Sequence, residues 1–450
     1  MTTTVGPELA EWVLDRARRG GASAAETLII SAESLSAGVR LGRVENLKSS
    51  RERRLGLRVF CGQSSATAST AEFDRNALAR FVTETIDLAR LTAPDPWSGL
   101  PDPKLHPKQL PELELVDTDH GVIDADRALA KAREAEGAAL GFDPRIRNSE
   151  GAEFASGYHE LIFANNQGFC GQYGATSYSL SVVPVAQAGE VMQRDQWYSV
   201  NRRYDKIESP ESIGRTAATR VLRRLGARKI KTTRVPVVFD PDMAASLLRA
   251  FVGAASGPAL YRGASFLIDK LGHQVASPQV TIFDDGLIHG GLGSKPFDGE
   301  GLATRRKTVV DKGVLSTYLL DNYSARKLKL EPTGNASRGV GDSPGVSPTN
   351  LYLEPGPYTP EAIVGSVKNG LFVTELIGFG VNAVTGDYSR GASGIWIENG
   401  ELAYPVQEIT IAGNLKDMFL SIDMVGNDLS WRSSIASPTL KISELTIAGS

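Results

Sequence analysis

The chain has 450 residues, of which 41% are hydrophobic and 22% are charged, and 49 Lys and Arg against 52 Asp and Glu give a formal net charge of −3. This composition excludes a disordered or collagen-like chain and predicts a globular protein of two or three domains. The near balance of charge leaves no global field that would attract nucleic acid or an anionic membrane surface.

Cysteine and histidine are scarce, with two Cys and five His. Cys61 and Cys170 lie far apart and form no Cys-x-x-Cys pair, which favours a reducing compartment. Residues 1–7 lack the basic start and apolar core of a secretory signal, and no stretch approaches the roughly 18 apolar residues that span a bilayer. We therefore expect a cytoplasmic protein without membrane association.

Residues 1–93 are predicted to form an N-terminal α+β domain. Apolar residues recur at helical spacing between Pro7 and Gly20, and Asp74 is placed to cap a second helix. Between the two helices, alternating apolar residues and turn signals predict five short strands, at 26–31, 36–41, 44–49, 55–61 and 64–70.

A proline-rich segment, residues 94–118, is predicted to be a stiff extended connector, because six prolines between 94 and 111 exclude a helix or a central strand. Residues 119–230 then predict a middle α+β domain. It has a helix at 124–140, strands between 145 and 199 with turns at 165–168 and 188–189, and a helix that starts at Ser209-Pro210.

Residues 215–234 hold eight basic residues and no acidic one. A nucleic-acid patch is one interpretation. The other is a solvated helix face followed by a linker, and it is favoured because no aromatic residues interleave with the charges.

Residues 231–450 are predicted to form a mainly β C-terminal domain. A buried strand at 236–240 enters a helix at 243–252, and short strands follow, interrupted by a helix at 323–328. The strands are expected at 279–283, 314–320, 371–377, 394–398, 405–411 and 440–447. The fold class is therefore α+β throughout.

Candidate site residues stand out only weakly. No two histidines lie within a helical turn of each other, and His-Glu-x-x-His is absent. Asp284, Asp285, Asp298 and Glu300, with His273 and His289, are candidates for cation binding or acid–base work, although turn residues are the simpler interpretation. Glycine-rich segments predict loops around a groove, with candidate residues Asp298, Glu300, Asn335, Asn382, Thr385, Asp387 and Ser389.

Several motifs in the C-terminal half carry a resemblance to the TldD/PmbA family, also called peptidase U62 or modulators of DNA gyrase. The motifs include Phe297-Asp-Gly-Glu-Gly301, Thr333-Gly-Asn335, Thr385-Gly-Asp-Tyr-Ser389, Ile409-Thr-Ile-Ala-Gly-Asn414 and Leu445-Thr-Ile-Ala-Gly449. The resemblance implies a family with two branches. TldD-like chains carry His-Glu-x-x-x-His and a later Cys as zinc ligands with Glu as general base, and PmbA/TldE-like chains lack them.

By position, the helix after Asp240 resembles the zinc helix with Arg249, Ala250 and Ala254 at the places of the first His, the Glu and the second His. Arginine keeps its proton and alanine has no donor atom, so neither can bind zinc or act as a base. Residues 428–438, where the family's Cys would fall, contain no Cys. The resemblance therefore implies no catalytic residue, metal ligand or cofactor in this chain, with zinc in a TldD-like partner.

Three hypotheses follow. The first is a non-catalytic TldE/PmbA-like subunit of a heterodimeric zinc protease that acts on extended, unfolded peptides. The second is a homodimer that binds peptides or another ligand without catalysis. The third is an independent hydrolase that uses Asp298, Glu300 and His289.

Overall fold

The computed structural model describes residues 6–119 and 123–449. His120 and most of the segment inspected for a secretory signal lie outside the described residues. Within the described part of the chain, no helix is both long and apolar enough to cross a bilayer.

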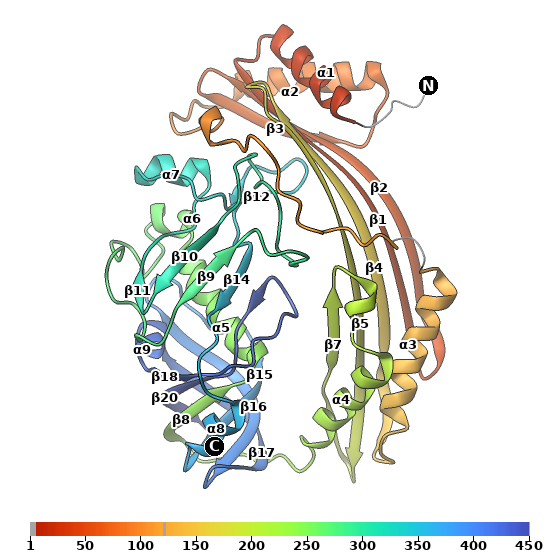
Figure 1. Ribbon diagram of the computed structural model, residues 1–450, viewed down its shortest axis with the longest axis vertical. Helices are drawn as coiled ribbons and strands as arrows, with labels where there is room; N and C mark the ends of the chain where they lie inside the picture. The colour runs from red at the N-terminus through yellow and green to blue at the C-terminus, as the bar shows by residue number, and fades with distance from the viewer. Residues whose placement is uncertain (1–5, 120–122, 450) are drawn as a thin grey trace.

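A long, curved antiparallel sheet forms one side of the molecule (Figure 1). The strand order is β3-β2-β1-β4-β5-β6, and β7 also pairs with β5. The strands are β1 (Ala24–Arg40), β2 (Arg43–Cys61), β3 (Ser64–Thr70), β4 (Ile146–Asn165), β5 (Cys170–Ala188), β6 (Val191–Arg194) and β7 (Trp197–Asn201). Because β1 pairs with both β2 and β4, the ranges 1–93 and 119–230 contribute strands to one sheet.

Of the five short strands predicted between residues 26 and 70, the last is confirmed as β3, and the other four were wrong, because β1 runs for 17 residues and β2 for 19. The part of β2 between Arg43 and Arg54 is almost entirely exposed, so it has no buried face that would produce an alternating apolar pattern. Strand β3 pairs only with residues 55–61 of β2. The hairpin arm formed by the rest of β2 therefore has one open edge.

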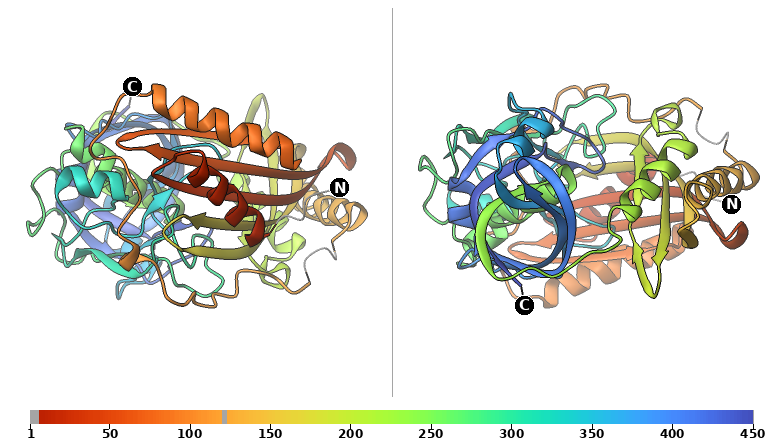
Figure 2. Two further views of the ribbon diagram at one scale, coloured as in Figure 1. Left: turned by 90° about the horizontal axis from the view of Figure 1, so that it is seen from above. Right: turned by 90° about the horizontal axis from the view of Figure 1, so that it is seen from below.

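Four helices cover the two ends of this sheet (Figures 1 and 2). Helices α1 (Pro7–Arg19) and α2 (Arg75–Leu91) pack on one end, and α3 (Ala125–Leu140) and α4 (Pro210–Leu222) pack on the other. The predicted caps of α2 and α4 are confirmed, since Asp74 Oδ1 accepts from the backbone N–H of Asn76 at 2.9 Å and Ser209 Oγ from that of Ser212 at 3.2 Å.

The proline-rich connector is extended, as predicted, apart from one 3₁₀ turn at Pro103–Leu105. His106 anchors it, because the ring stacks on Phe169 with centroids 4.7 Å apart and Nδ1 lies 2.9 Å from the carbonyl oxygen of Gly301. Asn165, at the end of β4, places its side-chain nitrogen 3.0 Å from His106 Nε2. The connector is thus held to both the long sheet and the C-terminal part of the chain.

The C-terminal part is built largely from short strands, which confirms the predicted α+β class with a β-rich end. One sheet closes on itself, since β17 pairs with β16, β16 with β15, β15 with β8, β8 with β20, and β20 with β17 (Figure 2, right). These strands are β8 (Thr233–Phe239), β15 (Asn369–Ile377), β16 (Asp387–Glu398), β17 (Glu401–Asn414) and β20 (Leu440–Ala448), and β18 (Ile422–Val425) extends the sheet beside β20.

A second sheet has the order β11-β10-β9-β14-β19. Its strands are β9 (Ile282–Asp285), β10 (Arg306–Asp311), β11 (Val314–Leu315), β14 (Asn350–Leu353) and β19 (Ile435–Ala436), and β12 (Ala336–Ser337) pairs with β13 (Gly345–Val346) nearby. The strand predicted at 314–320 is therefore much shorter than expected. The helices of this part are α5 (Pro241–Ala254), α6 (Gly257–Tyr261), α7 (Asn322–Leu328), α8 (Pro360–Gly365) and α9 (Leu415–Leu420).

Helix α5 lies in the main core between the two C-terminal sheets, with Leu247, Leu248 and Phe251 buried. Its contacts include β8 and β15 of the closed sheet and β14 and β19 of the second sheet. The position of α5 is therefore fixed by packing on both sheets, and one narrow stripe of its surface faces outward.

Candidate functional site

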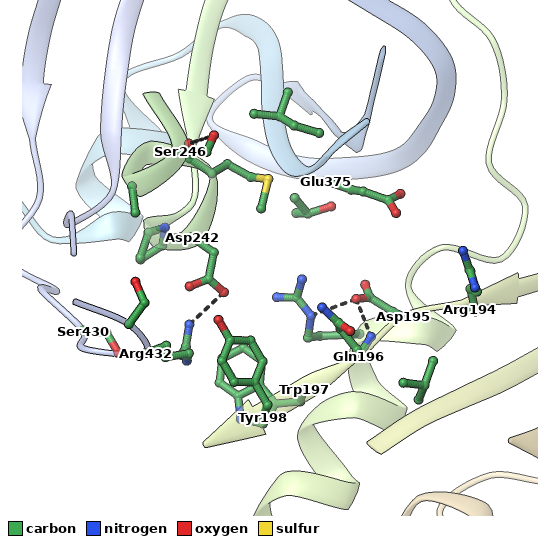
Figure 3. Close-up of a pocket in the computed structure, with 18 of the residues that line it drawn as sticks. Arg194, Asp195, Gln196, Trp197, Tyr198, Asp242, Ser246, Glu375, Ser430 and Arg432 are labelled. Atoms are coloured by element: carbon green, nitrogen blue, oxygen red, sulfur yellow. Dashed lines mark hydrogen bonds and ion pairs between the residues drawn. The ribbon is translucent and has the colours of Figure 1, made fainter. Parts of the chain in front are cut away.

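A cavity of about 520 Å³ opens between the long sheet and the C-terminal part (Figure 3). Residues 194–198, together with Arg220 and Arg224, form one wall, and residues of α5, the end of β15 and the segment around 430–435 form the other. The site is therefore assembled from segments far apart in the sequence.

Helix α5 begins at this cavity because Asp240 caps it. Asp240 Oδ1 accepts from the backbone N–H of Met243 at 2.9 Å, and Pro241 occupies the first turn. With the apolar side buried, Asp242, Ser246 and Arg249 recur at helical spacing along the wall of the cavity. Because the apolar face of α5 packs in the core, the polar residues on its other face are directed toward the cavity.

Of the three positions that the resemblance assigns to a degenerate zinc helix, only Arg249 lines the cavity, where its side chain is exposed. Ala250 packs partly buried against the core, and Ala254 is fully buried in it. Helix α5 continues through Gly253 to Ala254. Positions 249 and 254 therefore lie about 140° apart around the helix axis and face different surroundings.

The segment in which the family's cysteine would fall reaches the same cavity as Arg249. Ser430, Arg432 and Ser433 line it, and Arg432 Nη1 lies 3.0 Å from Asp242 Oδ2 on α5. The two segments that the resemblance connects thus meet in space, but hydroxyls and a guanidinium stand where thiolate and imidazole ligands would be needed.

The donor atoms at this site do not suit zinc. Arg249 has no free lone pair and Ala250 and Ala254 have no donor atom. Among residues 6–119 and 123–449, no group of three or more His, Cys, Asp and Glu side chains is arranged to hold a metal ion. The carboxylates of the cavity face guanidinium groups instead, so the metal that the resemblance implies for the family does not fit the residues of this chain.

Ion pairs define the electrostatics of the cavity. Four arginines on its walls pair with carboxylates: Arg194 with Glu150 at 2.8 Å, Arg220 with Asp195 at 3.2 Å, Arg224 with Glu375 at 2.6 Å and Arg432 with Asp242 at 3.0 Å. Two of them have a second, longer contact of 3.8 Å, Arg220 with Asp240 and Arg224 with Asp195. The Arg224–Glu375 pair joins the two walls, whereas Arg432 and Asp242 both belong to the wall that includes α5.

Trp197 contacts one arginine from each wall of the cavity (Figure 3). The guanidinium carbon of Arg432 lies 3.8 Å from the centre of its ring, and that of Arg220 lies 5.3 Å from it. Cation–π contacts of this kind are stabilising by about 1 kcal/mol or more where water is excluded. The indole Nε1 donates to Glu208 at 3.2 Å, which fixes the ring plane.

Asp240 lies behind the cavity wall, where burial disfavours the charged form of its carboxyl group. Burial raises the pKa of this carboxyl to about 6, against the opposing effects of the Met243 N–H and the Arg220 charge, which lies 3.8 Å away. The neighbouring Arg223 is also buried, and burial lowers its pKa. Asp240 caps α5 and Arg223 follows α4, so the two groups come from elements on the two sides of the cavity.

The sequence-based interpretation of residues 215–234 as a solvated face was wrong for its central part. Arg220 and Arg224 are only 14% and 15% exposed and line the cavity in ion pairs. Their carboxylate partners, Asp195 and Glu375, come from distant segments, so no local pattern could reveal the pairing. The regular spacing of 220 and 224, one helical turn apart, was the available signal.

Asp298, Glu300 and Asn335 do not line this cavity, because they are buried with exposures of 2%, 1% and 0%. Asp298 accepts from the N–H groups of Glu300, Leu302 and Ala336, and Asn335 donates to Asp284 at 2.8 Å. Burial raises the pKa of both Asp298 and Glu300. These carboxyl groups hold loops together and have no access to a substrate.

His289, the third member of the proposed hydrolase, is 65% exposed, and its Nδ1 lies 3.5 Å from Glu114 on the connector. An exposed imidazole cannot work with two carboxylates that the core encloses, since a shared substrate would have to reach all three. The arrangement gives no support to the hydrolase hypothesis.

Asn382, Thr385, Asp387 and Ser389 are exposed at the start of β16 and also stand outside the cavity lining. Thr385 Oγ1 donates to Asp387 Oδ2 at 2.6 Å, and Asn414 Nδ2 donates to Asp387 Oδ1 at 3.1 Å. These bonds close a turn at the start of β16, and Phe379, whose side chain is fully exposed, lies a few residues before it. The predicted loops exist, but they frame a surface rather than this cavity.

Comparison with protein-family models finds three matches along the chain. They are the PmbA/TldA metallopeptidase domain 1 at residues 25–89, the central domain at 119–225 and the C-terminal domain at 232–449. Together these matches cover most of the chain.

Individual relatives agree with this assignment. The chain is 39% identical to the metalloprotease PmbA of Escherichia coli O157:H7 over 430 residues, which is 96% of this chain and 93% of that protein. A crystal structure from Bacteroides thetaiotaomicron, whose name refers to modulation of DNA gyrase, superimposes with a TM-score of 0.92 at 31% identity and covers 100% of both chains. TldE of Thermococcus kodakarensis shares the fold, with a TM-score of 0.90 at 20% identity over 98% of this chain and 100% of that chain.

Proposed function

Because the chain belongs to the PmbA/TldD family of metallopeptidases, we propose that it is the non-catalytic subunit of a heterodimeric zinc protease whose partner is a TldD-like chain. One observation carries the proposal. Helix α5 and the 430–435 segment meet in one cavity, and they bring Arg249, Arg432 and two serines to it in place of zinc ligands.

The chemistry of these side chains is incompatible with hydrolysis by a bound metal. A catalytic zinc site needs three protein ligands and a base that can accept a proton from water. Arg249 supplies neither, and the acidic groups of the cavity are engaged by arginines. In this proposal the TldD-like partner holds zinc and the general base.

The contribution of this chain is then to bind and orient the substrate. Strand β7 pairs with β5 on one side, and Gln196, Trp197 and Tyr198 at its start line the cavity. A strand with an open edge binds an extended peptide through main-chain hydrogen bonds, which suits unfolded substrates of varied sequence. We place this activity in the cytoplasm, in line with two unpaired cysteines, Cys61 and Cys170.

Co-expression tests the assembly. A tagged copy of this chain is produced together with a His-Glu-x-x-x-His relative from the same genome, and in parallel with an unrelated zinc protease as the control. We expect the relative, and not the control protein, to be recovered in equal amount with the tagged chain. Recovery of the tagged chain only as a homodimer would favour the ligand-binding alternative instead.

Metal content and cleavage test the absence of catalysis in this chain. The isolated chain and the complex are incubated with an unfolded, fluorescently labelled peptide, with and without a chelator, and zinc is measured in each by mass spectrometry. We expect substoichiometric zinc and no cleavage for the isolated chain, and zinc-dependent cleavage for the complex. Chelator-sensitive turnover by the isolated chain would overturn the proposal.

A further inference from the structure

The walls of the cavity beside α5 carry one more positive charge than negative charge. Its lining includes five arginines and four carboxylates, Glu150, Asp195, Asp242 and Glu375. Each carboxylate is paired with at least one of four arginines, and Asp195 contacts both Arg220 and Arg224. Arg249 is the fifth arginine, and within the described part of the chain it has neither an ion pair nor a hydrogen bond.

A guanidinium group in this position is a permanent charge, because its pKa stays far above physiological pH. The other four arginines of the lining each have a carboxylate partner. The rigid helix α5 holds the backbone of Arg249, so the group presents its donors to the cavity without a competing carboxylate.

Tyr198 supplies a second donor in the same space. Figure 3 shows its ring standing beside Arg432 with the hydroxyl directed into the cavity. Within residues 6–119 and 123–449, the structure records no hydrogen bond for this hydroxyl. Burial raises the pKa of Tyr198, and the charges of Asp242, Arg432 and Arg249 also act on it, so the hydroxyl keeps its proton and can donate it in a hydrogen bond.

The charges on the cavity walls favour a singly charged anion over a multiply charged one. A multiply charged group such as phosphate would gain from one free guanidinium but would face four carboxylates on the surrounding walls. A carboxylate carries a single charge and matches the two-pronged donor geometry of arginine. Since the cavity of about 520 Å³ is far larger than one carboxylate, the group must belong to a larger ligand.

We infer that this cavity binds a carboxylate group of a peptide, with the guanidinium of Arg249 as its ion-pair partner and the hydroxyl of Tyr198 as a second donor. This inference rests on the proposed function in that it takes the ligand to be a peptide. The peptide chain then extends along the start of β7, where main-chain groups are available. The carboxylate is either the C-terminus of the peptide or an acidic side chain.

Three peptides distinguish these sources. The probes are N-acetylated penta-alanine with a free C-terminal acid, the same peptide as a C-terminal amide, and the amide peptide with aspartate at its last position. Affinities are measured by isothermal titration calorimetry on the isolated chain, since every residue of the site belongs to it. If the site binds a C-terminus, only the free-acid peptide should bind more tightly than the plain amide. If the site binds an acidic side chain, the aspartate peptide should also bind more tightly than the plain amide.

Variants connect the preference to Arg249. Loss of a charge-assisted hydrogen bond predicts that the amide binds about tenfold to a hundredfold more weakly than the preferred carboxylate peptide. In Arg249→Ala this ratio falls to within about threefold of one, because both peptides then lack the ion pair and only the Tyr198 hydroxyl still distinguishes them. Arg249→Lys keeps a preference, Tyr198→Phe reduces it, and the matched control Arg80→Ala, an exposed arginine on α2, leaves it unchanged.

Two results would overturn the inference: equal affinity of acid and amide peptides for the unmodified chain, or a ratio that persists in Arg249→Ala. Failure of all three probes to bind at millimolar concentration would count against it as well. Circular dichroism and thermal unfolding of each variant verify that the fold is retained. Because the titration needs no partner, a failed co-purification removes the heterodimer proposal alone, and a failed titration removes the carboxylate site alone.

Discussion

Glu26 and Arg338, which lie 312 residues apart in sequence, form a buried ion pair between β1 and the C-terminal part of the chain. Their side chains are 1% and 4% exposed. Arg58, on β2, also reaches Glu26 at 3.4 Å. A single carboxylate thus neutralises two cations where the long sheet meets the other half of the molecule.

This arrangement predicts an order of stabilities. Glu26→Ala leaves two buried guanidinium groups without a counter-charge and should lower the free energy of unfolding by about 3–5 kcal/mol. Arg338→Ala should cost less, about 2 kcal/mol, because Arg58 still neutralises Glu26. Denaturant unfolding measures both values, with the exposed Arg18→Ala as a control that changes little. A larger loss for Arg338→Ala than for Glu26→Ala would contradict this account.

Two helix-capping aspartates should respond to pH in opposite directions. Burial raises the pKa of Asp240 to about 6, above its unfolded value of 3.8, so the native state binds a proton more tightly and loses stability as pH rises through this window. Asp240→Asn can still cap α5 but does not titrate. Its stability relative to the unmodified chain should therefore increase between pH 4 and pH 7, by roughly 3 kcal/mol.

Asp74 is the matched control for this experiment. Hydrogen bonds from Ala77 and Asn76 lower its pKa, so its contribution to stability is present above pH 3.8 and is lost as pH falls. Asp74→Asn should consequently be at its greatest disadvantage at neutral pH and approach the unmodified chain in acid. Urea unfolding across this pH range gives the difference curves, and parallel curves for the two variants would argue against the burial of Asp240.

Two helical glycines have opposite surroundings. A Cβ on Gly214, in α4, would overlap the carbonyl oxygen of Ala135 in α3, whereas a Cβ on Gly253, in α5, meets nothing within 4 Å. Gly214→Ala should therefore destabilise the chain by about 2 kcal/mol, because two packed helix backbones must separate. Gly253→Ala should stabilise it by up to about 1 kcal/mol through helix propensity. Thermal unfolding distinguishes the two, and a stabilising Gly214→Ala would be inconsistent with the close approach of α3 and α4.

The connector depends on His106 for its attachment. His106→Ala removes the ring that stacks on Phe169 and the contact with Gly301, so residues 94–118 should be cleaved faster in limited proteolysis. His273→Ala is the control, since that ring is exposed, lies outside the connector and has its Nδ1 3.0 Å from the carbonyl oxygen of Leu271. Equal cleavage rates for the two variants would show that the prolines alone hold the connector.

The sequence predicts most helices well because their signals are local. Asp74 and Ser209 mark helix starts that depend only on the next few residues. The long strands were broken into short ones because β2 has charged residues on both faces, and its continuation is determined by pairing with β1. Pairing across the chain has no local pattern.

The candidate site also combines features that have a signal in the sequence with features that have none. A family resemblance pointed to α5 and to residues 428–438, and both segments reach the cavity. It did not reveal Trp197, Tyr198 or the Arg224–Glu375 pair, because these come from an edge strand and from residues 151 positions apart. Asp298 and Glu300 were candidates by residue type alone, and their burial, which no local pattern indicates, makes them structural in the fold.

The strand order of the closed sheet in the C-terminal part also determines when the sheet can be completed during synthesis. Strand β8, which ends at Phe239, completes its pairing only with β20, which begins at Leu440. At the ribosome's rate of about 5–20 residues per second, roughly 10 to 40 s pass between the two. During that interval β8 presents an unpaired apolar edge in the nascent chain. The yield of folded protein would therefore depend more on protection of this edge by a chaperone during those seconds than on the final stability of the sheet.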